Sequence, residues 1–297
     1  MSQNKPVQWF PGHMAKTRRL ISENLKQVDA VIEIVDARIP YSSHNPEIMK
    51  ITAGKPMITL LNKASLADPE KTAAFNAKYT SENRICIATD CISGEGINKI
   101  VPEIKRLLSD KLKRYEEKGM TGRKLKTMVV GIPNVGKSSF INRLSGAKKT
   151  KVENRPGVTL DKQWVSTSIG IDLLDMPGVL WPKFDERTVG ENLAITGAIK
   201  DTVVEIEAVA LALVSRLRNM YPALLCERYK LEKNLCDDGE FSDYDLFRLI
   251  GKKRGFLVSG GEINEERTAN MLLDEFRSGK IGRITLDSVK TDADAQR

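Results

Sequence analysis

Residues 131–138 read Gly-Ile-Pro-Asn-Val-Gly-Lys-Ser, and this stretch decides the fold. It matches the pattern G-x-x-x-x-G-K-[ST], follows the apolar run Thr127–Val130 and precedes a helical pattern from Ser139 to Leu144. In a strand–loop–helix unit of this kind, backbone N–H groups of the loop and the positive end of the helix bind phosphates. The sequence therefore predicts a nucleotide-binding loop.

Side chains of this loop have expected roles. Lys137 is expected to contact the β and γ phosphates and to take part in catalysis, and the hydroxyl of Ser138 is expected to ligate Mg²⁺. Further nucleotide contacts are expected from Asn134, Val135, Gly136 and Ser139.

Outward from the loop, short β-branched runs alternate with helix-like segments, which is typical of an α/β fold with a mostly parallel sheet. The runs that predict strands are Ala30–Val35, Pro56–Leu61, Arg84–Ala88, Thr127–Gly131, Gln163–Ser168 and Ile171–Leu174. Ligands of open α/β sheets bind beyond the carboxyl ends of strands. One site could therefore gather the residues at these ends, which are Asp36, Asn62-Lys63, Gly131 and Asp175.

Beyond Lys200 the strand pattern gives way to amphipathic helices, so we expect a domain at 1–200, with an N-terminal arm of about 20 residues, and a helical domain at 201–286. The predicted helices begin at a capping box from Thr202 to Glu205, at Ser242, and at Asn264 with an end near Arg277. The first carries an apolar stripe of Val209, Leu213 and Leu217. The polar tail at 287–297 is expected to be disordered.

Composition places the chain among ordinary globular proteins. Of 297 residues, 41% are hydrophobic and 29% are charged, and the formal charge is +8. The four cysteines form no C-x-x-C pair or zinc pattern, so reduced thiols are expected. No signal peptide and no apolar run of membrane-spanning length is found, which predicts a cytoplasmic protein without a membrane partner.

Two segments after the loop have the character of nucleotide switches. Asp175-Met-Pro-Gly178 places a carboxylate where it can hold Mg²⁺ through water, and a glycine N–H where it can sense a γ-phosphate. Thr159, in Arg155-Pro-Gly-Val-Thr159, is expected to reach the metal when a triphosphate is bound.

Before the loop, Asn62-Lys63 resembles the GTPase base-reading signature N-K-x-D, although an ordinary turn is the alternative. The order of base reader, phosphate loop and switches is possible if the sheet is circularly permuted.

Six blocks of sequence resemble the bacterial ribosome biogenesis GTPase A family, also called YlqF. They are Trp9–Lys16, Asp36–Pro40, Asn62-Lys63, Gly131–Ser138, Arg155–Thr159 and Asp175–Trp181. Gly197–Lys200 and Ser259–Gly261 also resemble that family, so the resemblance covers nearly the whole chain. The resemblance implies a circularly permuted GTPase domain and a helical RNA-binding C-terminal domain. It also implies a role in late assembly of the large ribosomal subunit, with GTP or GDP and rRNA as partners and no DNA.

One position departs from the family. Ser65 stands where the carboxylate of N-K-x-D would accept hydrogen bonds from guanine, and loss of that charged acceptor weakens selectivity. The resemblance places the second base-contacting loop at Asp90-Cys91. We therefore keep guanine as the expected base.

Hydrolysis needs a group that positions the attacking water, and Val179 stands where many GTPases have glutamine. The resemblance points to His13 on the N-terminal arm, and docking of that arm on rRNA would then gate hydrolysis. An imidazole in this arm could equally stack on RNA. Asn134 resembles the asparagine with which some GTPases bind K⁺ beside the phosphates.

Basic residues gather at 105–126, with nine Lys or Arg against three acids, which favours contact with RNA phosphates over a merely solvated surface. Further basic positions are Lys148-Lys149, Lys151, Arg248, Lys252–Arg254, Lys280 and Arg283. Two rival functions stay open at this stage. One is a small-molecule kinase, and the other is a non-catalytic RNA-binding scaffold with a weakened nucleotide site.

Overall fold

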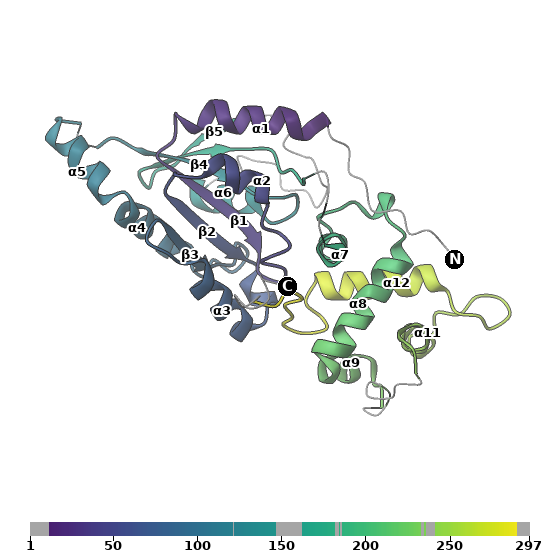
Figure 1. Ribbon diagram of the computed structural model, residues 1–297. Helices are drawn as coiled ribbons and strands as arrows, with labels where there is room; N and C mark the ends of the chain where they lie inside the picture. Colours follow the sequence, from purple (N-terminus) through teal and green to yellow (C-terminus); the bar gives the residue numbers. More distant parts are fainter. Residues whose placement is uncertain are drawn as a thin grey trace.

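The computed structural model describes residues 12–120, 122–146, 162–181, 184, 186–232, 235 and 241–289, with side chains from residue 15 onward. Its centre is a six-stranded sheet in the order β3-β2-β1-β4-β6-β5 (Figure 1). The strands are β1 (Ala30–Asp36), β2 (Met57–Asn62), β3 (Arg84–Ala88), β4 (Leu125–Val130), β5 (Gln163–Ser166) and β6 (Ile171–Asp175). Every predicted strand is present, and only β5 runs antiparallel to its neighbour.

Helices cover both faces of the sheet, because the central strands are apolar on both sides. All seven residues of β1 are buried, with Ile32 and Ile34 in the largest apolar cluster and Val31 in a second cluster. The second cluster lies under α1 (Gly12–Leu25) and α2 (Pro46–Thr52). The other helices of this half are α3 (Pro69–Tyr79), α4 (Ile97–Leu107), α5 (Ser109–Glu117) and α6 (Lys137–Ser145).

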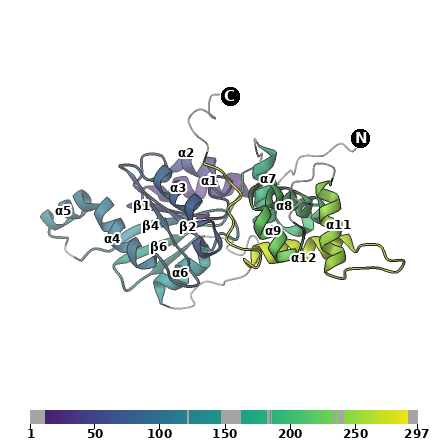
Figure 2. The same ribbon diagram turned by 90° about the horizontal axis from the view of Figure 1, so that it is seen from below.

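The C-terminal half is helical, as predicted. It contains α7 (Arg187–Ile195), α8 (Ile206–Met220), α9 (Pro222–Tyr229), α11 (Asp243–Lys253) and α12 (Glu265–Arg277). These helices lie beside the sheet, at the opposite end of the molecule from α5 (Figures 1 and 2). The large apolar cluster continues from the sheet into α7, α8 and α12, so the domain division near Lys200 stays a prediction.

Two of the three predicted helix starts in this half are confirmed. The Ser242 side chain accepts from the Asp245 N–H in a capping box, and Asn264 accepts from the Arg267 N–H. These bonds satisfy N–H groups that have no partner within the helix.

The capping box predicted at Thr202 is wrong. Residues Asp201–Val203 form a 3₁₀ turn, and α8 begins at Ile206 after Glu205, whose side chain makes no capping bond. The predicted stripe of Val209, Leu213 and Leu217 is nevertheless buried.

A C-terminal strap, defined here as residues 281–287, returns from α12 to the sheet. The Ile284 N–H donates to the Leu66 carbonyl over 3.0 Å, and the Leu286 N–H donates to the Arg38 carbonyl over 2.7 Å. Asp287 is buried, and its carboxylate accepts from the Ser42 hydroxyl and from the Asn192 amide. The expectation that Asp287 begins a disordered tail is therefore wrong.

Candidate nucleotide-binding site

The phosphate loop connects β4 to α6, as the sequence predicts, and its shape requires specific residues. Asn134 and Gly136 have positive φ angles of 60° and 101°. Asparagine and glycine tolerate this left-handed region better than other residues do. A Cβ atom on Gly136 would also collide with the Asn62 amide. The loop therefore turns tightly just before the first turn of α6, which contains Lys137, Ser138 and Ser139.

The base-reading segment is hydrogen-bonded directly to this loop. Asn62, the last residue of β2, donates from Nδ2 to the Val135 carbonyl over 2.7 Å. The Lys63 ammonium donates to the Asn134 carbonyl over 2.8 Å. Asn62 and Lys63 lie far from the loop in sequence and meet it in space, as the permuted order requires.

A buried ion-pair cluster fixes Lys63. Its ammonium lies 2.8 Å from Asp36 Oδ2, and Arg38 forms a two-pronged pair with the same carboxylate at 2.9 and 2.7 Å. Burial would raise the pKa of Asp36, but the charges of Arg38 and Lys63 outweigh it and hold the pKa well below its ordinary value. Sequence reasoning missed the role of Arg38; an arginine two residues after a strand-end aspartate was the available signal.

Lys137 and Asp175 form the charged centre of the site. The Lys137 ammonium donates to the carbonyls of Gly131 and Ile132 over 3.1 and 3.2 Å, and burial lowers its pKa to about 8 against the opposing charge of Asp175. Asp175 is 1% exposed, and burial raises its pKa to about 6, while Lys137 acts in the opposite direction.

The Asp175 carboxylate fits a role toward hydrated Mg²⁺. Neither of its oxygens has a hydrogen-bond partner within the described part of the chain. Buried polar atoms are rarely left in this state, and water molecules of a hydrated cation would satisfy them. Within the described ranges there is no cluster of three or more His, Cys, Asp or Glu that could hold a metal. A site built from phosphates, water, Ser138 and Asp175 needs no such cluster.

Gly178 lies against the phosphate loop. A Cβ atom at this position would stand 2.5 Å from the Lys137 ammonium and 3.2 Å from the Pro133 nitrogen. The close approach of the Gly178 backbone to the loop fits the expected switch segment.

Ser65 and Asp90 meet at the base-reading end. The exposed Ser65 hydroxyl donates to Asp90 Oδ2, while Asp90 Oδ1 accepts from the N–H groups of Ile92 and Ser93 over 2.8 and 3.0 Å. These hydrogen bonds lower the pKa of Asp90 although burial opposes them. Cys91 contributes its backbone, because its N–H donates to Asn62 Oδ1 and burial raises the pKa of its thiol to about 12.

Asn134 makes a contact that the sequence did not predict. Its Nδ2 donates to the Gly197 carbonyl over 2.7 Å, which joins the phosphate loop to the segment between α7 and α8. The proposed K⁺ ligand is therefore held in one amide orientation.

Two expected catalytic groups lie beyond what the structure describes. Thr159 is outside the described residues, and His13 belongs to α1 by its backbone while its side chain is outside them. Within the described residues, no helix is long and apolar enough to cross a membrane.

Comparisons with known proteins agree with this geometry. A family described as "50S ribosome-binding GTPase" matches residues 126–229. A "Ribosome biogenesis GTPase A" from Priestia megaterium is 46% identical and one from Bacillus pumilus is 43% identical; the alignments cover 95% of this chain and 96% and 98% of those proteins. A GDP-bound YlqF structure has a TM-score of 0.63 at 25% identity, covering 91% of this chain and 98% of that one. A GNP-bound YlqF from T. maritima has a TM-score of 0.61 at 24% identity, with coverage of 92% and 97%.

Proposed function

The chain belongs to the ribosome biogenesis GTPase A family, and we propose that it hydrolyses GTP on the large ribosomal subunit during late maturation of that subunit in the cytoplasm. One observation carries the proposal. Asn62 and Lys63, which precede the phosphate loop by some seventy residues, are hydrogen-bonded to its carbonyls at Val135 and Asn134. This contact joins base recognition to phosphate binding, as a permuted GTPase requires.

The nucleotide would lie along this junction. Asn62, Lys63, Ser65 and the Asp90-Cys91 turn would hold the base, and the loop from Asn134 to Ser139 would hold the phosphates. Ser138, Thr159 and Asp175 would hold Mg²⁺, the last through water, and Mg²⁺ supplies charge neutralisation between the phosphates. Lys137 would donate to the phosphates after leaving the carbonyls of Gly131 and Ile132. Gly178 would donate its N–H to a γ-phosphate.

K⁺ is proposed as a second cation beside the phosphates, with the Asn134 amide oxygen among its ligands. The Asn134 amide nitrogen already donates to Gly197, so the oxygen is the atom that is left for a cation. Equal hydrolysis rates in Na⁺ and K⁺ buffers would contradict this part of the proposal.

For the attacking water we propose His13. Val179 offers no hydrogen-bonding side chain at the place where many GTPases carry glutamine. Docking of the N-terminal segment on rRNA would bring His13 to the γ-phosphate, so hydrolysis would be slow in the free protein and faster on the subunit. A His13→Ala variant that keeps full stimulation by subunits would contradict the assignment.

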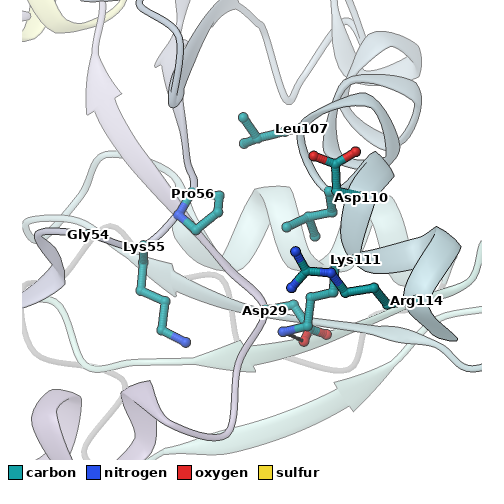
Figure 3. A pocket seen from close by; sticks show the side chains of 9 residues that line it. Asp29, Gly54, Lys55, Pro56, Leu107, Asp110, Lys111 and Arg114 are labelled. Atoms are coloured by element: carbon teal, nitrogen blue, oxygen red, sulfur yellow. Dashed lines mark ion pairs between the residues drawn. The ribbon is translucent and has the colours of Figure 1, made fainter.

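The basic helices α4 and α5 are proposed as an rRNA-binding surface. No residue of α5 is buried, and Lys105, Lys113, Arg114 and Lys118 have no ion pair within the described residues. A pocket of about 350 Å³ opens beside these helices, and Lys55, Lys111 and Arg114 line it together with Asp29 (Figure 3). Lys111 is paired with Asp29, so Lys105, Lys113, Arg114 and Lys118 are the cations that suit the phosphates of a folded RNA.

The test is to measure GTP and ATP hydrolysis by the purified protein in K⁺ buffer, with and without large ribosomal subunits. GTP-selective turnover that subunits stimulate is expected. Binding of GTP without turnover in either condition would favour a scaffold, and ATP-selective turnover would contradict the base assignment.

A further inference from the structure

The base-reading corner contains a serine and a carboxylate in an unusual arrangement. Ser65 occupies the fourth position of N-K-x-D and is exposed, so its hydroxyl can meet a base. Asp90 is 3% exposed and lies behind it, on the loop that follows β3. The signature normally presents a carboxylate at its fourth position. Here the carboxylate belongs to Asp90 and lies buried behind the exposed Ser65.

The hydrogen bonds of this pair fix the direction of the serine proton. A hydroxyl has one proton to donate and two lone pairs that accept. Ser65 donates its proton to Asp90 Oδ2, and Asp90 Oδ1 is held by the N–H groups of Ile92 and Ser93. The Ser65 oxygen is then left to act toward a ligand as an acceptor only.

We propose that Ser65 recognises guanine as a hydrogen-bond acceptor only. Asp90 is the positioning residue, because it accepts the Ser65 proton and so keeps that proton away from the base. The Ser65 oxygen accepts from the N1–H or the 2-amino group of guanine, the two donors that a signature aspartate would bind. The ionised Asp90 polarises the hydroxyl and strengthens it as an acceptor. This inference rests on the proposed guanine site.

The carboxylates of Asp68 and Asp36 already have partners within the protein. Asp68 caps α3, where Oδ1 accepts from the Glu70 and Lys71 N–H groups, and its Oδ2 accepts from the Tyr221 hydroxyl over 3.0 Å. Asp36 is engaged with Arg38 and Lys63. The Ser65–Asp90 pair is thus the acceptor that the described residues offer at the signature position.

The Ser65–Asp90 pair predicts discrimination among guanine, hypoxanthine and xanthine nucleotides that a serine without the carboxylate would not give. Xanthine carries a carbonyl oxygen where guanine carries its 2-amino group, and an acceptor-only oxygen repels it. Hypoxanthine has neither group and loses one contact. Sites that match a buried donor or acceptor discriminate strongly against ligands that leave it unpaired. The wild-type protein should therefore bind GDP better than IDP, and IDP better than XDP.

Asp90→Asn is the decisive variant. Its amide oxygen stays with the N–H groups of Ile92 and Ser93, since its NH₂ group would meet two donors there. The NH₂ group then donates to Ser65 and frees the hydroxyl proton for the base. GDP affinity should fall and XDP affinity should rise, so that the ratio between them shrinks by about tenfold or more. Loss of a merely structural contact would weaken both nucleotides equally.

Two variants of Ser65 extend the test to the serine itself. Ser65→Ala removes the acceptor and should lower GDP affinity by about tenfold. Ser65→Asp places two carboxylates at hydrogen-bonding distance, so it should bind GDP more weakly than the double variant Ser65→Asp with Asp90→Asn, which restores a single charge.

The measurement is a set of dissociation constants for GDP, IDP, XDP and ADP by calorimetry, with Glu95→Gln as a control for loss of one charge on the same exposed loop. Preference of the wild type for ADP would overturn the proposed guanine site itself. A wild type that prefers GDP, combined with an unchanged GDP-to-XDP ratio in Asp90→Asn, would overturn the reader assignment alone.

Discussion

At the scale of single residues, Asp36 lies where ligand-binding residues are expected, but its carboxylate is engaged within the protein. It ends β1 beside Asn62 of β2, where sequence reasoning placed it among candidate site residues. Its carboxylate is instead occupied by Arg38 and Lys63, and Arg38 is only 2% exposed. The cluster thereby holds the Lys63 ammonium beside the phosphate loop.

Asp36→Asn should destabilise the fold strongly. The substitution leaves the buried guanidinium of Arg38 without its counter-charge, and breaking a buried pair in this way costs about 3–5 kcal/mol. Urea unfolding measures the loss, with the exposed Glu70→Gln as the control. A difference below about 1 kcal/mol would mean that Arg38 finds another partner.

The same pair predicts a pH dependence. The pKa of Asp36 is lowered on folding, so its ionised form stabilises the native state above the unfolded pKa of 3.8, and this stability is lost as pH falls below that value. The gap in unfolding free energy between wild type and Asp36→Asn should be constant from pH 7 to about 5 and shrink as the pH falls through 3.8. Unfolding curves across this range measure it; a gap that widens in acid contradicts the ion-pair account.

Gly178→Ala should impair hydrolysis while leaving the fold intact. Its Cβ would displace the Lys137 ammonium, which can move, and would press on the loop at Pro133, which cannot move freely. Misplacement of catalytic groups by an ångström can cost about a hundredfold in rate. We expect kcat to fall about tenfold to a hundredfold. Gly190→Ala in α7 is the matched control, because the three atoms nearest to its Cβ all belong to the Phe184 ring, away from the phosphate loop.

At the scale of elements, the C-terminal strap joins the helical half to the base-reading turn. The Arg283 guanidinium donates to the carbonyls of Ala67 and Ala64 over 2.9 and 3.0 Å. These carbonyls belong to the 3₁₀ turn Ala64–Leu66, which carries Ser65, and to the residue after it. The strap therefore holds the turn in place from outside.

Arg283→Ala should weaken guanine nucleotides through this turn. Hydrogen bonds from a charged donor contribute about 1.5–3 kcal/mol, and the exposed position of Arg283 reduces this, so a loss of about three- to tenfold in GDP affinity is expected. Lys280→Ala, also exposed and adjacent to the strap, is the control. Equal affinities for both variants and the wild type would show that the turn holds itself.

The sequence predicted elements with a strong local signal and missed those set by distant contacts. Alternating apolar runs located all six strands, and Ser242 and Asn264 located two helices. Thr202 failed because Asp201–Val203 forms its own 3₁₀ turn, and Asp201 pairs with Arg277. The burial of Asp287 depends on Ser42 and Asn192, which no local pattern near the tail could reveal.

The residues of the candidate site also fall into those that the sequence predicted and those that it did not. The phosphate loop and Asn62-Lys63 could be predicted because their chemistry follows from residue type and spacing. The Ser65–Asp90 bond and the Arg38 pair depend on the meeting of separate loops, which spacing does not specify.

At the scale of the whole molecule, the cations that are free to bind RNA phosphates are unevenly distributed over the surface. The chain has 47 Lys and Arg against 39 Asp and Glu. In the helical half several cations are internally engaged, since Arg254 pairs with Glu275 and Arg248 with Glu262. On α5, Lys113 and Arg114 are exposed without such partners in the described residues. The end of the molecule that carries α5 is therefore the better electrostatic surface for RNA (Figure 1).

A double charge reversal, Lys113→Glu with Arg114→Glu, tests this distribution. Each cation that contacts a phosphate releases counterions, so its loss should make the slope of log K against log salt shallower by about one. Binding to large ribosomal subunits should weaken, with a slope shallower by about two, while GDP affinity stays unchanged because α5 lies far from the phosphate loop. Lys26→Glu with Lys50→Glu matches the charge change; Lys26 follows the last residue of α1 and Lys50 lies on α2, the two helices that cover the opposite face of the sheet. Equal weakening by both pairs would mean that net charge, rather than the α4–α5 surface, attracts the RNA.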